Sequence, residues 1–183
     1  MRIVSGVFKG KRIIAPKKLP VRPTTDFAKE ALFNILNNRY DLDEVTVLDL
    51  FAGTGNISYE FASRGAESIC AVDGHFGCVK FIQKTADELE MPIRTVKSDV
   101  FKYLSKDPNK YSIVFADPPY NFSKEQMEEL VSLTMDNELL HEEGILILEH
   151  TKHLDLSTLK GYQESRRYGG SVFSFFSEKN EEK

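Results

Sequence analysis

From Val45 onward, short apolar segments alternate with longer amphipathic ones. The apolar segments predict strands at 45–51, 68–73, 93–97, 112–116 and 145–149. The amphipathic segments predict helices at 56–64, 75–90, 99–105 and 124–137. This alternation is typical of a mainly parallel sheet with helices on both faces. The pattern therefore predicts an α/β fold.

The last part of the chain changes to a pattern of two adjacent strands. Segments 162–168 and 171–176 are joined through Gly169 and Gly170, which predicts an antiparallel hairpin added to the sheet. The phenylalanines of the second segment are expected to pack in the core rather than to stack on a base; they are Phe173, Phe175 and Phe176. Residues 179–183 are predicted to form a frayed tail.

The first forty residues follow a different pattern. Segments 2–4 and 7–15, placed around turn-forming glycines, predict a β-hairpin. A connection with prolines follows, and Thr24-Thr25-Asp26 supplies the N-cap of a helix predicted over about 26–38. We expect residues 1–40 to form an extension and residues 41–178 to form the main domain.

Length and composition exclude several classes of protein. The 183 residues fit one domain, and no apolar run approaches the ~18 residues that span a bilayer. Cys70 and Cys78 do not have the spacing of a metal or redox motif, and the basic start of the chain is broken by glycine and proline. We therefore expect a cytoplasmic protein without a membrane partner. The histidines form no ligand set, so no metal is expected, and His150 and His153 are expected at the surface.

Charge is distributed unevenly along the chain. The net charge is -4, yet residues 1–39 carry nine lysines and arginines against two acidic residues, which leaves -11 for the remainder. A basic extension on an acidic body suits a polyanion such as nucleic acid, although a solvated basic terminus would give the same charges. The candidate phosphate contacts are Arg2, Lys9, Lys11, Arg12, Lys17, Lys18 and Arg22. Arg22 and Thr24-Thr25 have the alternative of facing a cofactor cleft.

A loop with two glycines follows the first strand of the main domain. Residues 49–55 read Asp-Leu-Phe-Ala-Gly-Thr-Gly. Glycine lets a ligand approach the backbone, and the first N–H groups of the next helix can receive a carboxylate. Because open α/β sheets bind ligands at the carboxyl ends of their strands, Gly53 and Gly55 are candidate cofactor residues, together with Asp49 and Phe51 before them. A tight turn without a ligand is the alternative.

Two aspartates close the next two strands. Asp73 comes twenty residues after Gly53 and can accept hydrogen bonds from both ribose hydroxyls of an adenosine. Asp99 follows the third strand and can accept a hydrogen bond from an adenine amino group. Each aspartate could instead cap the helix that follows it. The spacing at Asp73 also fits NAD, but Ser58 occupies the position of the third glycine in the dinucleotide fingerprint.

The fourth strand ends in Asp117-Pro118-Pro119-Tyr120. Two consecutive prolines fix an extended backbone and remove two N–H donors. The Asp117 carboxylate and the Pro118 carbonyl can then hold an exocyclic amino group, which is a poor nucleophile because its lone pair is delocalised into the ring. Tyr120 offers a flat face to an extruded base, and such stacking contributes ~1–3 kcal/mol. These four residues are the candidate catalytic site for a reaction between the amino group of a base and an electrophile, and a plain turn is the alternative.

The glycine loop, Asp73, Asp99 and the Asp-Pro-Pro-Tyr loop together resemble the ordered motifs of class I amino methyltransferases. Three further segments, 2–6, 9–12 and 22–36, are similar to the RsmD family of bacterial small-subunit rRNA methyltransferases. The specific motifs run from Arg2 to about Tyr120. The resemblance implies a Rossmann-like methyltransferase sheet, the cofactor S-adenosylmethionine, and methyl transfer to the 2-amino group of a guanine in 16S rRNA, with assembled 30S particles as substrate.

By the same resemblance, Gly53 and Gly55 line the cofactor, Asp49 lies near its methionine end, Asp73 holds the ribose and Asp99 holds the adenine. Residues 117–120 then hold the guanine. Lys29 and Phe27 stand where the family frequently has arginine, and Asp73 stands where it commonly has glutamate. Because lysine lacks the bidentate fork of arginine, no precise contact is expected at Lys29.

Three other functions remain open at this point. Related Pro-Pro-Tyr loops serve DNA adenine and protein glutamine methyltransferases, and a protein of this fold could also be an rRNA-binding assembly factor without activity. The short chain leaves no room for a separate DNA-recognition domain, so we expect no DNA partner. We also expect a monomer.

Overall fold

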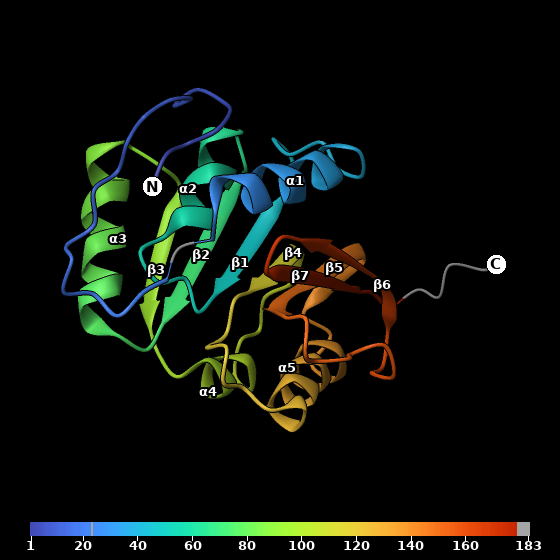
Figure 1. Cartoon of the computed structure of the whole chain (residues 1–183). Helices are drawn as coiled ribbons and strands as arrows, with labels where there is room; N and C mark the ends of the chain where they lie inside the picture. Colours follow the sequence, from blue (N-terminus) through green and yellow to red (C-terminus); the bar gives the residue numbers. More distant parts are fainter. Residues whose placement is uncertain (23, 179–183) are drawn as a thin grey trace.

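A seven-stranded sheet forms the centre of the molecule (Figure 1). The computed structural model describes residues 1–22 and 24–178, so the predicted tail at 179–183 lies outside the described residues. The strands are β1 (Thr46–Leu50), β2 (Ser68–Asp73), β3 (Ile93–Lys97), β4 (Tyr111–Ala116), β5 (Leu140–Thr151), β6 (Tyr162–Tyr168) and β7 (Ser171–Phe176). The helices are α1 (Asp26–Asn37), α2 (Asn56–Ser63), α3 (Phe76–Glu88), α4 (Val100–Leu104) and α5 (Lys124–Asp136).

The order of the strands in the sheet is β3-β2-β1-β4-β5-β7-β6. Strands β1 to β5 are parallel to their neighbours, and β7 joins β5 and β6 in antiparallel pairing. The α/β fold, the parallel sheet and the terminal hairpin are confirmed, and β5 extends beyond the predicted 145–149. The chain order reverses between β1 and β4, and their carboxyl ends therefore form a topological switch point, where ligands bind in such sheets.

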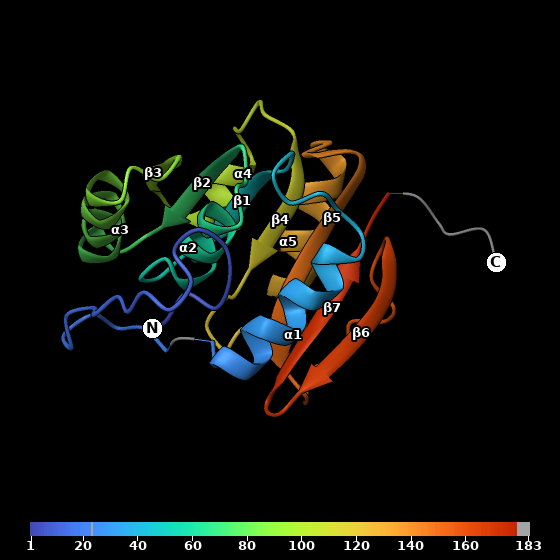
Figure 2. The same cartoon turned by 90° about the horizontal axis from the view of Figure 1, so that it is seen from above.

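Helices cover both faces of the sheet, as Figures 1 and 2 show together. Alternate residues of each strand enter two different hydrophobic clusters because side chains of a strand point to opposite faces. In β1, Val47 packs with α1, α2 and α3, whereas Leu48 packs with α4 and α5. The helices thus bury both faces of the strands, which explains why the parallel strands are apolar along most of their length.

The first fifteen residues form a shorter hairpin than predicted, without two regular strands. Arg2 pairs with Arg12 in an antiparallel bridge, Ile3 N donates to the Lys11 carbonyl at 2.9 Å, and Ile13 N donates to the Met1 carbonyl at 3.0 Å. Side chains of α2 take the hydrogen bonds that a partner strand would otherwise take: the Glu60 carboxylate accepts from the backbone N–H groups of Val4 and Ser5, both at 3.0 Å. Residues 4–9, between the paired ends, therefore form a loop over α2.

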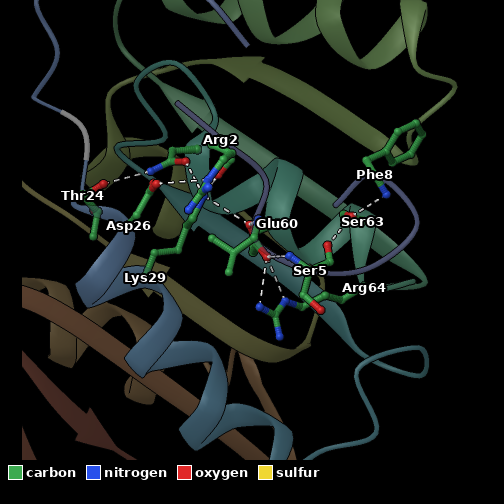
Figure 3. A network of polar contacts seen from close by, with 11 residues as sticks. Arg2, Ser5, Phe8, Thr24, Asp26, Lys29, Glu60, Ser63 and Arg64 are labelled. Atoms are coloured by element: carbon green, nitrogen blue, oxygen red, sulfur yellow. Dashed lines mark hydrogen bonds and ion pairs between the residues drawn. The ribbon is translucent and has the colours of Figure 1, made fainter. Parts of the chain in front are cut away.

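A buried ion pair joins this loop to α1 and α2 (Figure 3). Lys29 of α1 and Glu60 of α2 have side chains with 1% and 0% exposure, and Lys29 Nζ lies 3.2 Å from Glu60 Oε2. Lys29 Nζ also donates to the Arg2 carbonyl at 2.6 Å and to Asn56 Oδ1 at 3.0 Å. The expectation that Lys29 makes no precise contact is wrong, because three acceptors surround one compact ammonium group.

Two other expectations concern side chains in the C-terminal part of the chain. Phe173, Phe175 and Phe176 are fully buried, which confirms their assignment to the core. His153 is exposed as expected, but His150 is 7% exposed, so its predicted surface placement is wrong. Its two ring nitrogens lie 2.8 Å from the Thr151 carbonyl and 2.7 Å from Ser174 Oγ, and these partners satisfy its polar atoms in the interior. Burial also lowers the pKa of His150.

Among the described residues, no helix is long and apolar enough to cross a membrane.

Replacement of Lys29 by alanine is expected to lower the free energy of unfolding by about 3 kcal/mol, because one member of a buried pair then remains without its partner. In this variant Glu60 still has its ion pair with Arg64, at 3.0 Å. The expected loss therefore lies at the lower end of the range for buried ion pairs that lose one partner. Urea unfolding followed by circular dichroism measures the change. Lys84→Ala is the control: Lys84 is 73% exposed, and its loss changes stability by less than about 1 kcal/mol. Equal small effects of both substitutions would contradict the role given to Lys29.

Candidate active site

The carboxyl ends of β1 and β4 lie side by side in the sheet, with Leu50 opposite Ala116. The glycine loop leaves β1 at this edge, and the Asp-Pro-Pro-Tyr loop leaves β4 beside it. The backbone N–H of Asp117 approaches the Leu50 carbonyl at 3.4 Å, which continues the contact between the two strands by one residue. The structure thus brings the predicted cofactor loop and the predicted catalytic loop to one place.

The glycine loop has an unusual backbone. Phe51, Gly53 and Gly55 have φ of 55°, 58° and 89°, values that favour glycine and that strain a phenylalanine. A Cβ atom on Gly55 would lie 2.7 Å from the ring of the buried Tyr59, so no other residue fits there. Helix α2 begins directly after Gly55 without a side-chain cap. The start of α2 can therefore receive an anionic group, and the buried Asp49 carboxyl already takes a backbone hydrogen bond from Ser58 in its first turn.

Asp73 holds the glycine loop in place. Its Oδ2 accepts from Gly53 N at 2.9 Å, and its Oδ1 accepts from His75 N at 2.8 Å. The side-chain cap of α3 is His75, so the capping alternative for Asp73 is wrong. Asp99 does cap α4, since its Oδ1 accepts from Lys102 N at 2.9 Å.

Asp49 lies beneath the glycine loop and is 1% exposed. Ser58 of α2 donates a hydrogen bond of 2.6 Å to its Oδ2. Burial is the main cause that raises the Asp49 pKa from 3.8 to about 7, and the negative charge of Asp73 adds to it, whereas the Ser58 hydrogen bond opposes it. A carboxyl group that titrates near neutral pH thus lies between the two loops.

Glu149, which the sequence did not reveal, stands beside Asp117. Ala116 of β4 pairs with Leu148 of β5. Because the two strands are parallel, the residues that follow this pair, Asp117 and Glu149, are also neighbours. Glu149 is 7% exposed and accepts hydrogen bonds from Thr24 Oγ1 at 3.0 Å and Ser171 Oγ at 2.8 Å. The predicted strand 145–149 ended at this residue, and a carboxylate at the end of a buried strand was the available signal.

Asp117 differs from its neighbours because no described residue donates a hydrogen bond to its carboxylate. Asp117 is half-buried, and Pro118 after it is buried. Burial raises the pKa of Asp117 well above its ordinary value, and the charges of Glu149 and Asp49 raise it further, while Arg22 lowers it. The pKa of Glu149 is raised as well, again mainly by burial. The edge therefore carries a group of carboxyls that favours protonation or a positively charged neighbour.

The segment before α1 reaches the carboxyls of this edge. Thr24 binds Glu149, and its carbonyl accepts from Asn56 Nδ2 at 3.2 Å. Arg22 is exposed, and its charge lowers the pKa of both Asp117 and Glu149. Thr24 thus lies at these carboxyls, and Thr25 after it is the N-cap of α1. The other basic candidates of the extension are exposed, and Arg2 Nε lies 3.5 Å from Asp26 Oδ2; they are Lys9, Lys11, Arg12, Lys17 and Lys18.

Aromatic side chains surround the same edge. Tyr120 is 78% exposed, and Pro119 before it is also exposed. Phe51 packs edge-on against Phe122 at 5.4 Å between ring centroids, and Phe101 stacks on Phe122 at 6.0 Å. The sequence did not single out the last two rings, because only the tertiary structure brings α4 and the loop after β4 together.

The described residues contain no group of three or more histidines, cysteines or acidic residues arranged to hold a metal ion.

The raised pKa of Asp49 predicts a dependence of stability on pH. Between about pH 4 and pH 7 the folded protein holds a proton on Asp49 that the unfolded chain releases, so stability falls as pH rises through this window and then levels off. A shift from 3.8 to about 7 corresponds to about 4 kcal/mol. Asp49→Asn should remove this part of the slope. Urea unfolding from pH 4 to pH 8 measures it.

The matched control is Asp41→Asn, which removes an exposed carboxylate before β1. The curve of this variant is expected to run parallel to that of the unchanged protein. If the Asp49→Asn curve is parallel as well, the carboxyl does not titrate as the structure implies.

Comparisons with known proteins show the family of this chain. A family model described as "Conserved hypothetical protein 95" matches residues 1–177. The chain is 31% identical over 166 residues to the "Putative rRNA methyltransferase YlbH" of Bacillus subtilis, covering 88% of each chain. It is 30% identical over 160 residues to "Ribosomal RNA small subunit methyltransferase D" of Escherichia coli, covering 87% of this chain and 79% of the relative.

A solved structure has the same architecture over nearly its whole length. The "putative methyltransferase" yhhF from Escherichia coli superposes with a TM-score of 0.84 at 28% identity, and the match covers 96% of each chain. The family match, the two relatives and this structure include both the extension and the sheet. The chain therefore belongs to the family described as Conserved hypothetical protein 95, the RsmD family of class I methyltransferases that use S-adenosylmethionine.

Proposed function

We propose that this protein methylates the 2-amino group of a specific guanine in 16S rRNA, with assembled 30S particles as its cytoplasmic substrate. The observation that carries the proposal is the Asp117 carboxylate, which lies at the switch point beside the glycine loop and receives no hydrogen bond from a described residue. The names of the relatives, which describe rRNA and small-subunit rRNA methyltransferases, support the RNA substrate.

The residues at the edge fit S-adenosylmethionine. Gly53 and Gly55 leave the backbone open where a Cβ would intrude, and the uncapped start of α2 suits a carboxylate such as that of the methionine part. The two Asp73 oxygens each have lone pairs left for the ribose hydroxyls. Asp99 uses Oδ1 as a cap, and its other oxygen remains for the adenine amino group. Asp49, under the loop, is proposed near the methionine end.

The bound cofactor supplies a methyl group on a positively charged sulfur. The task of the protein is therefore to hold the guanine amine in line with that methyl group, and such alignment contributes ~7–11 kcal/mol to a reaction of two partners. Asp117 and the Pro118 carbonyl are proposed to accept the two N–H bonds of the amine. The prolines restrict the backbone, so these acceptors stay in place without a loss of conformational entropy at each turnover.

Asp117 is also proposed to receive the proton that the amine releases. The amine becomes acidic only as the new bond forms, so a strong base is not needed before transfer. The raised pKa of Asp117 makes its carboxylate a better proton acceptor than an exposed aspartate. Glu149, fixed by Thr24 and Ser171, contributes negative charge that maintains this pKa.

The exposed face of Tyr120 is proposed to stack on the guanine after it leaves its own helix. The basic residues of the extension, Arg2, Lys9, Lys11, Arg12, Lys17 and Lys18, are proposed to bind rRNA phosphates. Arg22 is the exception: its effect on Asp117 and Glu149 favours a place in the catalytic cleft. We also propose that the protein acts as a monomer.

Asp117→Ala is expected to reduce methyl transfer at least about 100-fold, because both the orientation of the amine and its proton acceptor are lost. Cofactor binding should change little, since Gly53, Gly55 and Asp73 remain. Transfer of a radiolabelled methyl group to small subunits from cells without this protein measures the first quantity, and calorimetry measures the second. Asp41→Ala serves as the matched surface control.

Mass spectrometry of the product nucleosides identifies the methylated base. N2-methylguanosine is the expected product. N6-methyladenosine, or near-normal transfer by Asp117→Ala, would contradict the proposal.

A further inference from the structure

A cleft of about 730 Å³ lies outside the active site, between the N-terminal segment 11–19 and one side of α3. In Figures 1 and 2 this segment, drawn in blue, passes beside α3 before it turns toward α1. The α3 residues that line the cleft recur every three or four positions, from Gly77 to Glu88, and so form one stripe along the helix. The cleft therefore follows the length of α3.

Positive charge dominates this cleft. The segment contributes Lys11, Arg12 and Lys18, and α3 contributes Lys80 and Lys84. All five side chains are exposed, and the single acidic residue of the lining is Glu88. Within residues 1–22 and 24–178, only Lys84 of these five has an acidic partner, Glu88 at 3.8 Å. The charges are thus largely uncompensated, in a protein whose net charge is -4.

One end of the cleft meets the active-site edge. Leu19 packs against Gly77, where a Cβ would lie 2.9 Å from Leu19 Cδ2, and Gly77 follows Asp73 by only four residues. Two residues after Leu19, Val21 lies against Gly53, with Cγ1 at 3.2 Å from the position of a Cβ. A polymer bound along the cleft would therefore lead directly to the glycine loop and to the carboxyl group beyond it.

Apolar side chains lie between the cations. Ile13 is buried, Phe81 is half-buried, and Ile14 is 88% exposed although it lines the cleft. Cations interleaved with apolar side chains suit a chain that carries phosphates together with flat, weakly polar groups. A small anion would use the charges but would not contact the apolar side chains.

We propose that the sugar-phosphate backbone of a single RNA strand next to the target guanine binds in this cleft, with Lys80 and Lys84 of α3 as phosphate contacts. Residues four positions apart on a helix have Cβ atoms about 5–6 Å apart, a spacing that allows two lysines to reach successive phosphates. The inference rests on the proposed function and extends it: α3 forms a second wall of the RNA site, opposite the basic extension.

The test compares Lys80→Ala/Lys84→Ala with the matched control Lys106→Ala/Lys110→Ala. The control lysines lie between α4 and β4, at the amino end of the sheet, and are exposed. Alanine favours helix, so α3 is expected to stay folded. The probe is a ten-nucleotide oligouridine, which contains no guanine, and its affinity is measured by fluorescence anisotropy from 50 to 200 mM salt.

Loss of two phosphate contacts should lower affinity roughly tenfold at low salt and reduce the slope of log K against log salt by about 1.4. Methylation of small subunits should show a raised KM with little change in kcat, and cofactor binding should not change. The control pair should behave as the unchanged protein does. An unchanged salt slope for the α3 double variant would overturn the inference. An effect of the α3 substitutions on methylation of intact subunits, without any effect on oligouridine binding, would overturn it as well, since it would indicate that α3 contacts a ribosomal protein.

Glu88→Gln tests the same site in the opposite direction. Glu88 is the acidic residue of the lining and ends α3, where negative charge is unfavourable to the helix. Its neutralisation should strengthen oligouridine binding roughly twofold, because a charge that repels phosphate is removed and Lys84 is released. General damage to the fold would not raise affinity. Weaker or equal binding would contradict the proposed path.

These measurements separate the two proposals. Oligouridine binding that depends on the α3 lysines, together with failure to methylate guanine, would remove the proposed function and leave the cleft as an RNA site. Guanine methylation that is unchanged by substitution of Lys80, Lys84 and Glu88 would support the proposed function and exclude the cleft as an RNA site.

Discussion

The ion pair between Lys29 and Glu60 holds together the parts of the molecule on which the site depends. Its atoms lie in the interior, where an unpaired charge would be strongly unfavourable, so the three segments that contribute partners must remain in contact. These segments are the N-terminal loop, α1 and α2. Helix α2 begins at the end of the glycine loop, and α1 begins two residues after Thr24, so the pair fixes the glycine loop and Thr24 relative to each other.

The N-terminal extension therefore does more than present positive charge. It shares one hydrophobic cluster with the sheet through Ile3 and Ile13, lies along α3, contacts the glycine loop through Val21, and reaches Glu149 through Thr24. A single continuous segment thus links a basic cleft to the carboxyl group of the proposed catalytic edge.

Three carboxyl groups lie close together at this edge, and the positive charge of Arg22 opposes the rise in the pKa of Asp117 and Glu149. Asp49, Asp117 and Glu149 lie on the same face of the sheet, and burial raises the pKa of each. Thr24, Ser58 and Ser171 donate hydrogen bonds to two of them, whereas no described residue donates one to Asp117, which has the positive charge of Arg22 nearby.

The sequence alone determined the features that depend on neighbours along the chain. Alternation of apolar and polar residues located nearly every strand and helix, and the glycine loop and Asp117-Pro118-Pro119-Tyr120 were evident because their chemistry lies in consecutive residues. Tertiary structure decided the rest: the loop that residues 4–9 form over α2, the burial of Lys29 and His150, and the position of Glu149. Each of these depends on a polar partner far away in the sequence, such as Glu60, Ser174 or Thr24. A local pattern cannot show whether a polar side chain will meet such a partner, and this contact decides whether it is buried.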